Sequence, residues 1–342
     1  MVYMNTYINH IPSELWKYAK RINKLRVGTD CSGIEIPLMA LDMIESIINK
    51  KIAEHVFSSD IDAHVREFIS KNFHTPQIDN NLMDRRVFPK TDLYLAGFPC
   101  QSFSNSGRQQ GFDDERGNVF FGVYKYILKT LPTVFILENV KNLVHHDGGS
   151  TYKLMTNYLN SIGKYNIYDK VINTQDYGIP QSRHRIYIVG ILKTKDSGFH
   201  FPNYTIPHTS IDSLLIDRKI HGDTILSNRE QHSLNMMLEK DITMRQNPHA
   251  NWVINLDVSD YTRGRRYINY SPCLYTRCKY YLLKYGRHLY PEEVLRLQGI
   301  NYEYYDWSMF NENNLYKVAG NAMSVNVLVI ILLQIFRYVT FV

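Results

Sequence analysis

A cysteine, a glutamate and two arginines stand where the chain leaves or enters apolar runs. Cys100 follows Pro99 in AGFPCQSFSNSG, and Glu138 follows the apolar residues of VFILENV. Arg183 and Arg185 lie in QSRHR, directly before IYIVGIL. A thiol becomes a nucleophile where basic groups or backbone N–H donors stabilise its thiolate, and a carboxyl group can supply or hold a proton. Together these residues suggest covalent catalysis assisted by an acid.

Each of these residues also has a purely structural interpretation. A lone cysteine is more often a small buried apolar residue than a nucleophile. Glu138 and Asn139 could instead begin a helix, with Asn139 as its N-cap. Arg183 and Arg185 could form ordinary ion pairs, although their spacing of two at a strand entry would place both guanidiniums on one face. On the residues alone, both interpretations remain open.

The elements that must position these residues form a repeating pattern up to about Leu192. Apolar runs typical of strands alternate with helical segments; they are RVGTD, HVFSSD, TDLYLAG, VFILENV and RIYIVGIL. Strands separated by helices predict an α/β fold with a mostly parallel sheet, in which ligands bind beyond the carboxyl ends of the strands. The polar residues of interest follow such ends: Ser32, Asp60, Cys100 and Glu138.

The pattern changes after Lys193. Residues 193–286 mix Pro, His, Asn, Tyr and Arg with weak periodicity, and YTRGRRYINYSPCLYTRC interleaves basic residues with tyrosines. That composition suits phosphate contacts and stacking on bases, but it equally suits a solvated, Tyr-rich loop region. From Leu289 the chain regains helical character, in PEEVLRLQG and in NLYKVAGNAMSVNVLVIILLQIF.

The bulk composition is that of a folded protein with a mild positive bias. The chain has 342 residues, 44% of them hydrophobic, and a net charge of +6, which permits a polyanionic partner without requiring one. Four cysteines do not make a disulfide scaffold, so we expect a reducing, intracellular setting. Cys273 and Cys278 lack a second ligand pair, and we expect no metal.

Neither end of the chain predicts a membrane segment. The N-terminus is polar and basic and lacks the apolar core of a secretory signal. The most apolar stretch, Val325 to Val342, is interrupted by Asn326, Gln334 and Arg337. It falls short of the roughly 20 apolar residues of a membrane span, so we expect a buried helix and no membrane partner.

Five motifs occur in a recognisable order: GFPCQSFS, ENV, QSRHR, PEEVLRLQG and GNAMSVNV. This series resembles that of the cytosine-C5 DNA methyltransferases and extends over nearly the whole chain. The resemblance implies a Rossmann-like S-adenosylmethionine-dependent methyltransferase fold with helices on both faces of the sheet. It further implies a catalytic domain of residues 1–192 and 287–342, and a small, irregular target-recognition domain of residues 193–286.

The resemblance assigns a role to each candidate catalytic residue. Cys100 matches the nucleophile that attacks C6 of a flipped cytosine, and Glu138 the carboxyl group that holds and protonates N3. Arg185 matches the arginine near the cytosine O2, and Arg183 the one that supports the site. Covalent addition at C6 makes C5 nucleophilic enough to take up a methyl group.

The resemblance also implies S-adenosylmethionine as cofactor, with S-adenosylhomocysteine as product. Asp60 matches the acid that binds the ribose, and Ile61 packs against the adenine. The full set of expected cofactor residues is Cys31, Ser32, Gly33, Ile34, Asp60, Ile61, Asn81, Leu82, Gly97, Pro99, Val119, Asn321 and Ala322. The first turn departs from the family pattern, which has a Phe and a glycine-rich run where this chain has Cys31 and only Gly33.

Double-stranded DNA is the expected partner, and we expect a monomer. The enzyme would work alongside a separate restriction endonuclease or within a viral or phage system. SNSGRQQGFDDERGN is similar to the mobile catalytic loop of the family. Expected DNA contacts are Ser104, Ser106, Arg108, Arg116, Arg263, Arg265, Arg266 and Arg277.

Two other functions compete with this one. The first is a tRNA cytosine-C5 methyltransferase of the same fold; the CQSFS that follows Pro99, in place of a CFT-like sequence, disfavours it. The second is a DNA-binding homologue without catalysis, which the intact set of catalytic positions disfavours. The DNA sequence that is recognised cannot be read from the chain.

Overall fold

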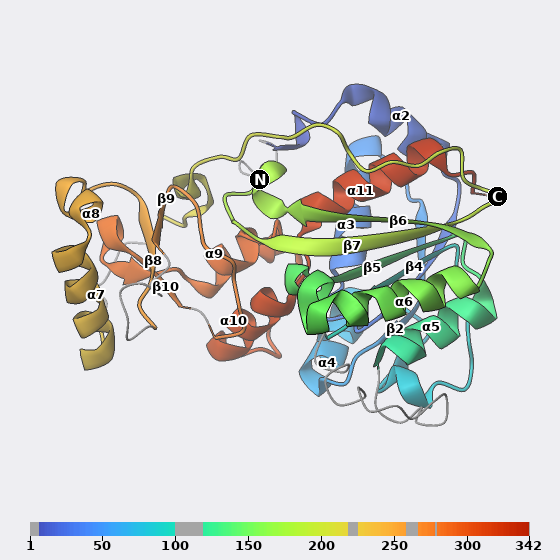
Figure 1. The fold of residues 1–342 in the computed structure, drawn as a ribbon, viewed down its shortest axis with the longest axis horizontal. Coiled ribbons are helices and arrows are strands. Elements are labelled where there is room, and N and C mark those ends of the chain that lie inside the picture. Colours follow the sequence, from blue (N-terminus) through green and yellow to red (C-terminus); the bar gives the residue numbers. More distant parts are fainter. Residues whose placement is uncertain (1–6, 100–118, 218–224, 258–265, 278, 342) are drawn as a thin grey trace. The chain divides into compact units, whose positions relative to one another are not determined.

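The computed structural model describes residues 7–99, 119–217, 225–257, 266–277 and 279–341 (Figure 1). The chain divides into two compact units. The large unit comprises Ile11–Ile172, His184–Tyr204 and Val327–Val342, and the small unit comprises Met1–His10, Asn173–Arg183 and Thr205–Asn326. This division differs from the expected boundaries, since residues 287–326 group with the small unit.

A seven-stranded sheet forms the centre of the large unit. Its strands are β1 (Leu25–Asp30), β2 (Ala53–Ser59), β3 (Ile78–Asp79), β4 (Leu93–Gly97), β5 (Val134–Val140), β6 (Tyr165–Asn173) and β7 (His184–Leu192). They lie in the order β3-β2-β1-β4-β5-β7-β6. The first five pair in parallel and β7 runs antiparallel to β5, so the sheet is mostly parallel, as predicted.

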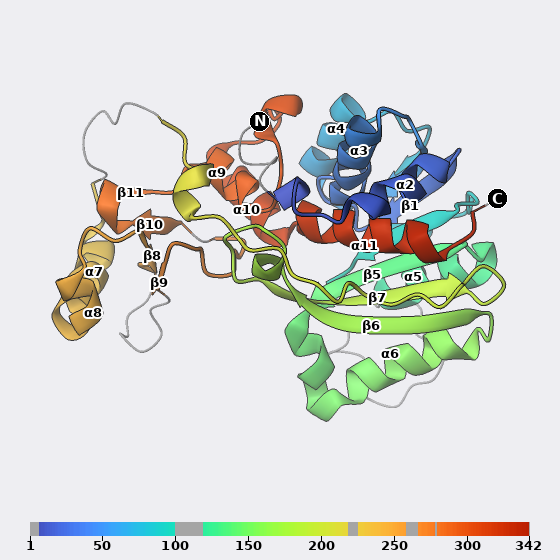
Figure 2. The same cartoon turned by 90° about the horizontal axis from the view of Figure 1, so that it is seen from above.

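Helices cover both faces of this sheet. They are α2 (Ser13–Arg21), α3 (Ile36–Ile48), α4 (Ala63–Asn72), α5 (Val119–Thr130), α6 (Ser150–Ser161) and, from Val327 on, α11 (Val325–Tyr338). Figure 2 shows α2, α3 and α11 on one face and α6 on the other. The first six residues of β5 are buried, as expected for a central strand that is covered on both sides.

An aromatic core fills the face under α5 and α6. Tyr94 of β4 stacks on Tyr126 of α5 at 4.3 Å between ring centroids, and Phe135 of β5 packs edge-on against Tyr165 of β6. All four rings are buried. This packing fixes β4 and β5, the two strands whose ends carry the candidate catalytic residues, against the same pair of helices.

The C-terminal apolar stretch is a core helix. Glu312–Tyr338 is long and apolar enough to cross a membrane, with a mean hydropathy of 2.0 in its most apolar window. However, 94% of that window is buried inside the protein. The burial agrees with the buried helix that the sequence predicted here.

The small unit has its own sheet, in the order β11-β10-β8-β9 with antiparallel pairs. Its strands are β8 (Trp252–Asn255), β9 (Arg266–Ile268), β10 (Tyr280–Leu282) and β11 (Arg287–His288), and its helices are α7 (Asn228–Lys240), α8 (Ile242–Gln246), α9 (Pro291–Arg296) and α10 (Glu312–Asn321). Met237 of α7 and Met244 of α8 pack with Trp252 and Ile254 of β8. The unit is therefore more regular than its sequence suggested.

Candidate active site

The ends of β4 and β5 lie side by side. Gly97, the last residue of β4, is the register partner of Glu138 in β5. The Asn139 side chain donates from Nδ2 to the carbonyl oxygen of Phe98 at 2.8 Å, and both residues are buried. Pro99 is exposed. The segment that leads from β4 toward residue 100 is thus fixed next to the carboxyl-bearing end of β5.

Glu138 and Arg185 form an ion pair near the carboxyl ends of β4 and β5. Arg185 Nε lies 3.2 Å from Glu138 Oε1, and the two side chains are only 13% and 9% exposed. The pairing of β5 with β7 brings them together, since Val140 is the partner of Arg185 and Tyr187 that of Glu138. A largely dry carboxyl group next to a guanidinium can hold a polar ligand in a fixed orientation.

Arg183 has a different setting from Arg185. It precedes β7, which begins at His184, so the strand alternation that was expected to align the two arginines does not reach it. Arg183 is 1% exposed, and its guanidinium donates to three backbone carbonyl oxygens of the small unit, those of Leu274, Gly320 and Ala322. These bonds join three segments of the small unit to one another.

A second cluster of predicted residues lies at the ends of β1 and β2. The Gly33 backbone N–H donates to Asp60 Oδ2 at 2.9 Å, and Asp62 N–H donates to the other Asp60 oxygen at 2.9 Å. Burial raises the pKa of the Asp60 carboxyl. Ile61 is 81% exposed although it is apolar, and a Cβ at Gly33 would meet no atom of the described residues within 4 Å. The Asp60 carboxyl group, the apolar side chain of Ile61 and the open space at Gly33 therefore lie close together in the sequence and at the same strand ends.

The turn after β1 has an unusual backbone. Cys31, Gly33 and Glu35 have φ angles of 49°, 52° and 59°, in the left-handed region that residues other than glycine rarely adopt. Ser32 Oγ accepts from the backbone N–H of Ser59 at 2.9 Å, which ties the turn to β2. Ile34 is 1% exposed, so its side chain belongs to the core.

The remaining expected cofactor residues have varied surroundings. Asn81 begins the short 3₁₀ segment Leu82–Asp84, its Oδ1 accepting from Met83 N–H, and Leu82 packs closely on Gly122 of α5. Val119 is half-buried at the start of α5. In the small unit, Asn321 is exposed and Ala322 is buried.

Several predicted residues lie outside the described part of the chain: Cys100, Ser104, Ser106, Arg108, Arg116, Arg263 and Arg265. Of the other two expected DNA contacts, Arg277 is exposed in a turn. Arg266 is half-buried and paired with Asp241.

The sequence did not predict the contacts of three buried side chains near these sites. Arg85 is 7% exposed, pairs with Asp30 at the end of β1, and donates from Nε to Asp79 at 2.7 Å. Asn139 bridges to Phe98 and does not cap a helix by its side chain. Glu35 is fully buried under the first turn. The sequence shows only that each is a polar residue next to an apolar run. That pattern does not predict which residues it contacts.

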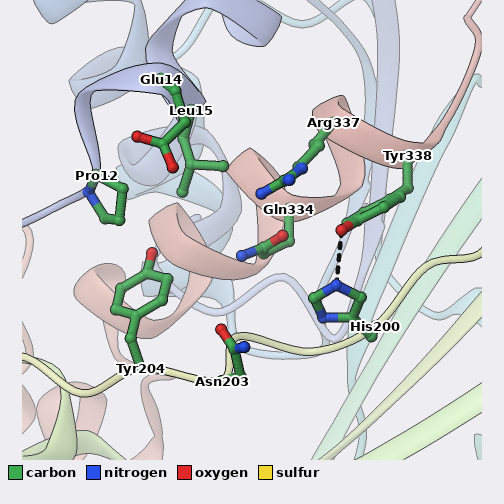
Figure 3. Close-up of a pocket in the computed structure, with 9 residues that line it drawn as sticks. All are labelled: Pro12, Glu14, Leu15, His200, Asn203, Tyr204, Gln334, Arg337 and Tyr338. Atoms are coloured by element: carbon green, nitrogen blue, oxygen red, sulfur yellow. Dashed lines mark hydrogen bonds between the residues drawn. The ribbon is translucent and has the colours of Figure 1, made fainter.

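A pocket of the large unit lies apart from these clusters (Figure 3). It is lined by Pro12, Glu14, Leu15, His200, Asn203, Tyr204, Gln334, Arg337 and Tyr338. The hydroxyl of Tyr338 and Nε2 of His200 are 2.6 Å apart across it. Of the predicted catalytic and cofactor residues that the structure describes, none lines this pocket.

Several solved structures with a similar fold are methyltransferases. The Entamoeba histolytica methyltransferase EhMeth superimposes with a TM-score of 0.64 and 18% identity, over 92% of this chain and 98% of that one. The S. pombe Dnmt2 methyltransferase gives 0.59 and 17%, over 92% and 98%. At these identities the likeness establishes the fold, an α/β methyltransferase fold.

The sequence comparison is more specific. Residues 31–337 match the family described as C-5 cytosine-specific DNA methylase. The Type II methyltransferase M.HaeII of Haemophilus aegyptius is 35% identical over 80% of this chain and 83% of its own length. M.NgoBI of Neisseria gonorrhoeae is 36% identical over the same shares. The chain belongs to this family and is a DNA (cytosine-5-)-methyltransferase.

Proposed function

We propose that this enzyme methylates C5 of a cytosine within a specific sequence of double-stranded DNA, with S-adenosylmethionine as donor. Catalysis would proceed through a bond between Cys100 Sγ and C6 of a cytosine flipped out of the duplex. The main support is the Glu138–Arg185 pair at 3.2 Å, beside the strand end that leads to Cys100. Flipping is required because C5 and C6 are stacked inside the duplex.

The chain's own residues account for most of the chemistry. As the Cys100 thiolate adds to C6, electron density moves to N3, where Glu138 supplies or shares a proton. Arg185 keeps the Glu138 carboxyl oriented and donates to the cytosine O2. Once C5 carries the methyl group, its proton leaves to a base that is not assigned, the S–C6 bond breaks, N3 returns its proton to Glu138 and the thiolate is regenerated.

The residues at the ends of β1 and β2 fit the proposed cofactor. S-adenosylmethionine supplies an electrophilic methyl group on a sulfonium. Each Asp60 oxygen accepts one backbone N–H, which leaves acceptor capacity for ribose hydroxyls. The exposed Ile61 offers an apolar surface to adenine, and the open space at Gly33 lets a ligand approach the backbone.

Sequence recognition belongs, in this proposal, to the small unit. Arg277 is exposed there, and arginine is the residue that most often reads guanine edges. Arg263, Arg265 and Arg266 are further proposed DNA contacts. The names of the relatives suggest a restriction–modification role alongside a separate endonuclease. We propose that the enzyme acts inside the cell as a monomer.

Methyl transfer from labelled S-adenosylmethionine to duplex DNA and to tRNA, assayed side by side, tests this function. We expect label on C5 of cytosine in DNA, at one sequence. DNA containing 5-fluorocytosine should trap a covalent adduct with the wild type, whereas Cys100→Ser should form no adduct and still bind DNA. Label on tRNA alone, or no adduct with the wild type, would overturn the proposal.

A further inference from the structure

Glu35 has a backbone conformation that is unfavourable for any residue with a side chain. It is the N-cap residue of α3, with φ 59° and ψ 46°, where glycine would be free of strain. A left-handed conformation strains the backbone of a residue that has a Cβ. We therefore expect contacts of the Glu35 side chain to offset this backbone strain.

The Glu35 carboxyl group bridges two strands. Its Oε1 accepts one hydrogen bond from Thr29 Oγ of β1 and one from Ser58 Oγ of β2, both at 2.6 Å. Thr29 Oγ in turn lies 2.7 Å from Ser32 Oγ, which binds the backbone of Ser59. One carboxyl oxygen thus joins β1 and β2 directly beneath the turn that bears Gly33.

The electrostatic surroundings favour a neutral carboxyl group. Glu35 is fully buried, and its other oxygen, Oε2, has no hydrogen-bond partner among the described residues. The titratable groups facing it are His55 of β2, at 3.7 Å, and Asp60. Burial raises the pKa of Glu35 to about 7 and lowers that of His55 to about 4, so both are uncharged just below neutral pH.

We propose that Glu35 is a positioning residue for the cofactor. By holding β1, β2 and the left-handed turn together, it keeps the Gly33 backbone in reach of the Asp60 carboxyl and so keeps both ready for the ribose. This inference rests on the proposed use of S-adenosylmethionine and adds a residue that the glycine-rich pattern of the family does not supply.

The test measures affinity for S-adenosylhomocysteine by calorimetry at pH 6.5. Glu35→Gln keeps an acceptor oxygen for both hydroxyls, so its affinity should stay within about twofold of the wild type. Glu35→Ala loses both bonds and should bind roughly tenfold or more weakly. Glu35→Gly relieves the backbone strain but lacks the bridge, so it should bind as weakly as the alanine variant.

A matched control lies on the same helix. Glu45 of α3 is also buried, but it accepts from the backbone N–H groups of Ile52 and Ala53 at the opposite end of the helix. Glu45→Gln should leave the affinity unchanged. Folding of every variant is checked by circular dichroism and by its thermal unfolding midpoint.

The dependence on pH separates positioning from simple packing. Between pH 6.5 and 8.5 the wild type should lose roughly tenfold in affinity, because an ionised Glu35 would add a buried charge beside Asp60. Glu35→Gln should lose much less, and any change it does show reports the titration of groups other than Glu35, the ligand included.

The outcomes distinguish the two proposals. If the wild type does not bind S-adenosylhomocysteine at any pH, the proposed cofactor is wrong. If the wild type binds and folded Glu35→Ala or Glu35→Gly binds equally well, the cofactor stands and the role of Glu35 is refuted. The same holds if Glu35→Gln shares the pH profile of the wild type.

Discussion

Glu138 and Arg185 orient each other at the edge of the sheet, and their pairing leads to a first prediction. Glu138→Gln keeps the size of the side chain but cannot supply a proton to N3. We expect kcat for DNA methylation to fall by roughly 100-fold or more, with little change in the unfolding temperature. The measurement is single-turnover methyl transfer. Glu54→Gln, at an exposed carboxyl of β2 that pairs with Lys24, should be fully active.

Arg183 permits a second prediction, because its guanidinium binds three carbonyl oxygens that a single ammonium group cannot span. Arg183→Lys should reduce the free energy of unfolding by about 2–4 kcal/mol, as two or more buried carbonyl groups lose their donors. Urea denaturation measures the loss. Arg185→Lys should mainly lower kcat. An Arg183→Lys protein of normal stability that is catalytically dead would instead show a direct role in the site.

For single residues, the sequence indicated which side chains could be functional, but it indicated few of the residues that they contact. Glu138 and Arg185 are both strand-end residues of strong apolar runs, and the structure brings them together. The partners of Arg183 lie 91, 137 and 139 residues further along the chain. No local pattern encodes such contacts, because they depend on how separate segments pack. The surroundings of Cys100 lie outside the described residues, and its role stays a proposal.

At the scale of elements, the apolar runs predicted five strands of the large unit, β1, β2, β4, β5 and β7, but not β3 or β6. Parallel, doubly covered strands are long apolar runs, as VFILENV illustrates. The small unit was harder to predict because its strands have two to four residues each and leave almost no periodicity. One signal was overlooked. Ser227 and Glu230 form a capping box at the start of α7, and the spacing SNRE was visible in the sequence.

The pairing of β5 with β7 leads to a third prediction. Gly190 is the register partner of Phe135, and a Cβ at position 190 would lie 2.0 Å from the Phe135 ring. Gly190→Ala should therefore reduce the free energy of unfolding by about 1–3 kcal/mol through overpacking. Thermal and urea denaturation measure this loss.

A second substitution tests the cause of that loss. Phe135→Leu makes room at the same contact, so the double variant should be less destabilised than the sum of the two single variants. Strictly additive losses would show that the ring is not what excludes a side chain at position 190.

At the scale of the whole molecule, two buried groups give the stability opposite dependences on pH. The pKa of Glu35 is raised by burial to about 7, so the folded protein keeps a proton that the unfolded chain loses above about 4.5. The free energy of unfolding therefore falls as the pH rises from about 4.5 to 7. The pKa of His55 is lowered by burial to about 4, so its contribution falls as the pH drops from about 6.5 to 4.

These two contributions oppose each other between pH 4.5 and 6.5, so removing one should reveal the other. Relative to the wild type, Glu35→Gln should gain up to about 1.4 kcal/mol in unfolding free energy per pH unit from pH 4.5 to 7. Relative to the wild type, His55→Gln should gain unfolding free energy as the pH falls from 6.5 to 4. Urea denaturation at half-unit intervals measures both differences, and subtracting the wild-type curve removes the shared titration of surface carboxylates. A flat difference for Glu35→Gln would mean that Glu35 is already ionised in the folded protein, and the opposition between the two groups would then not exist.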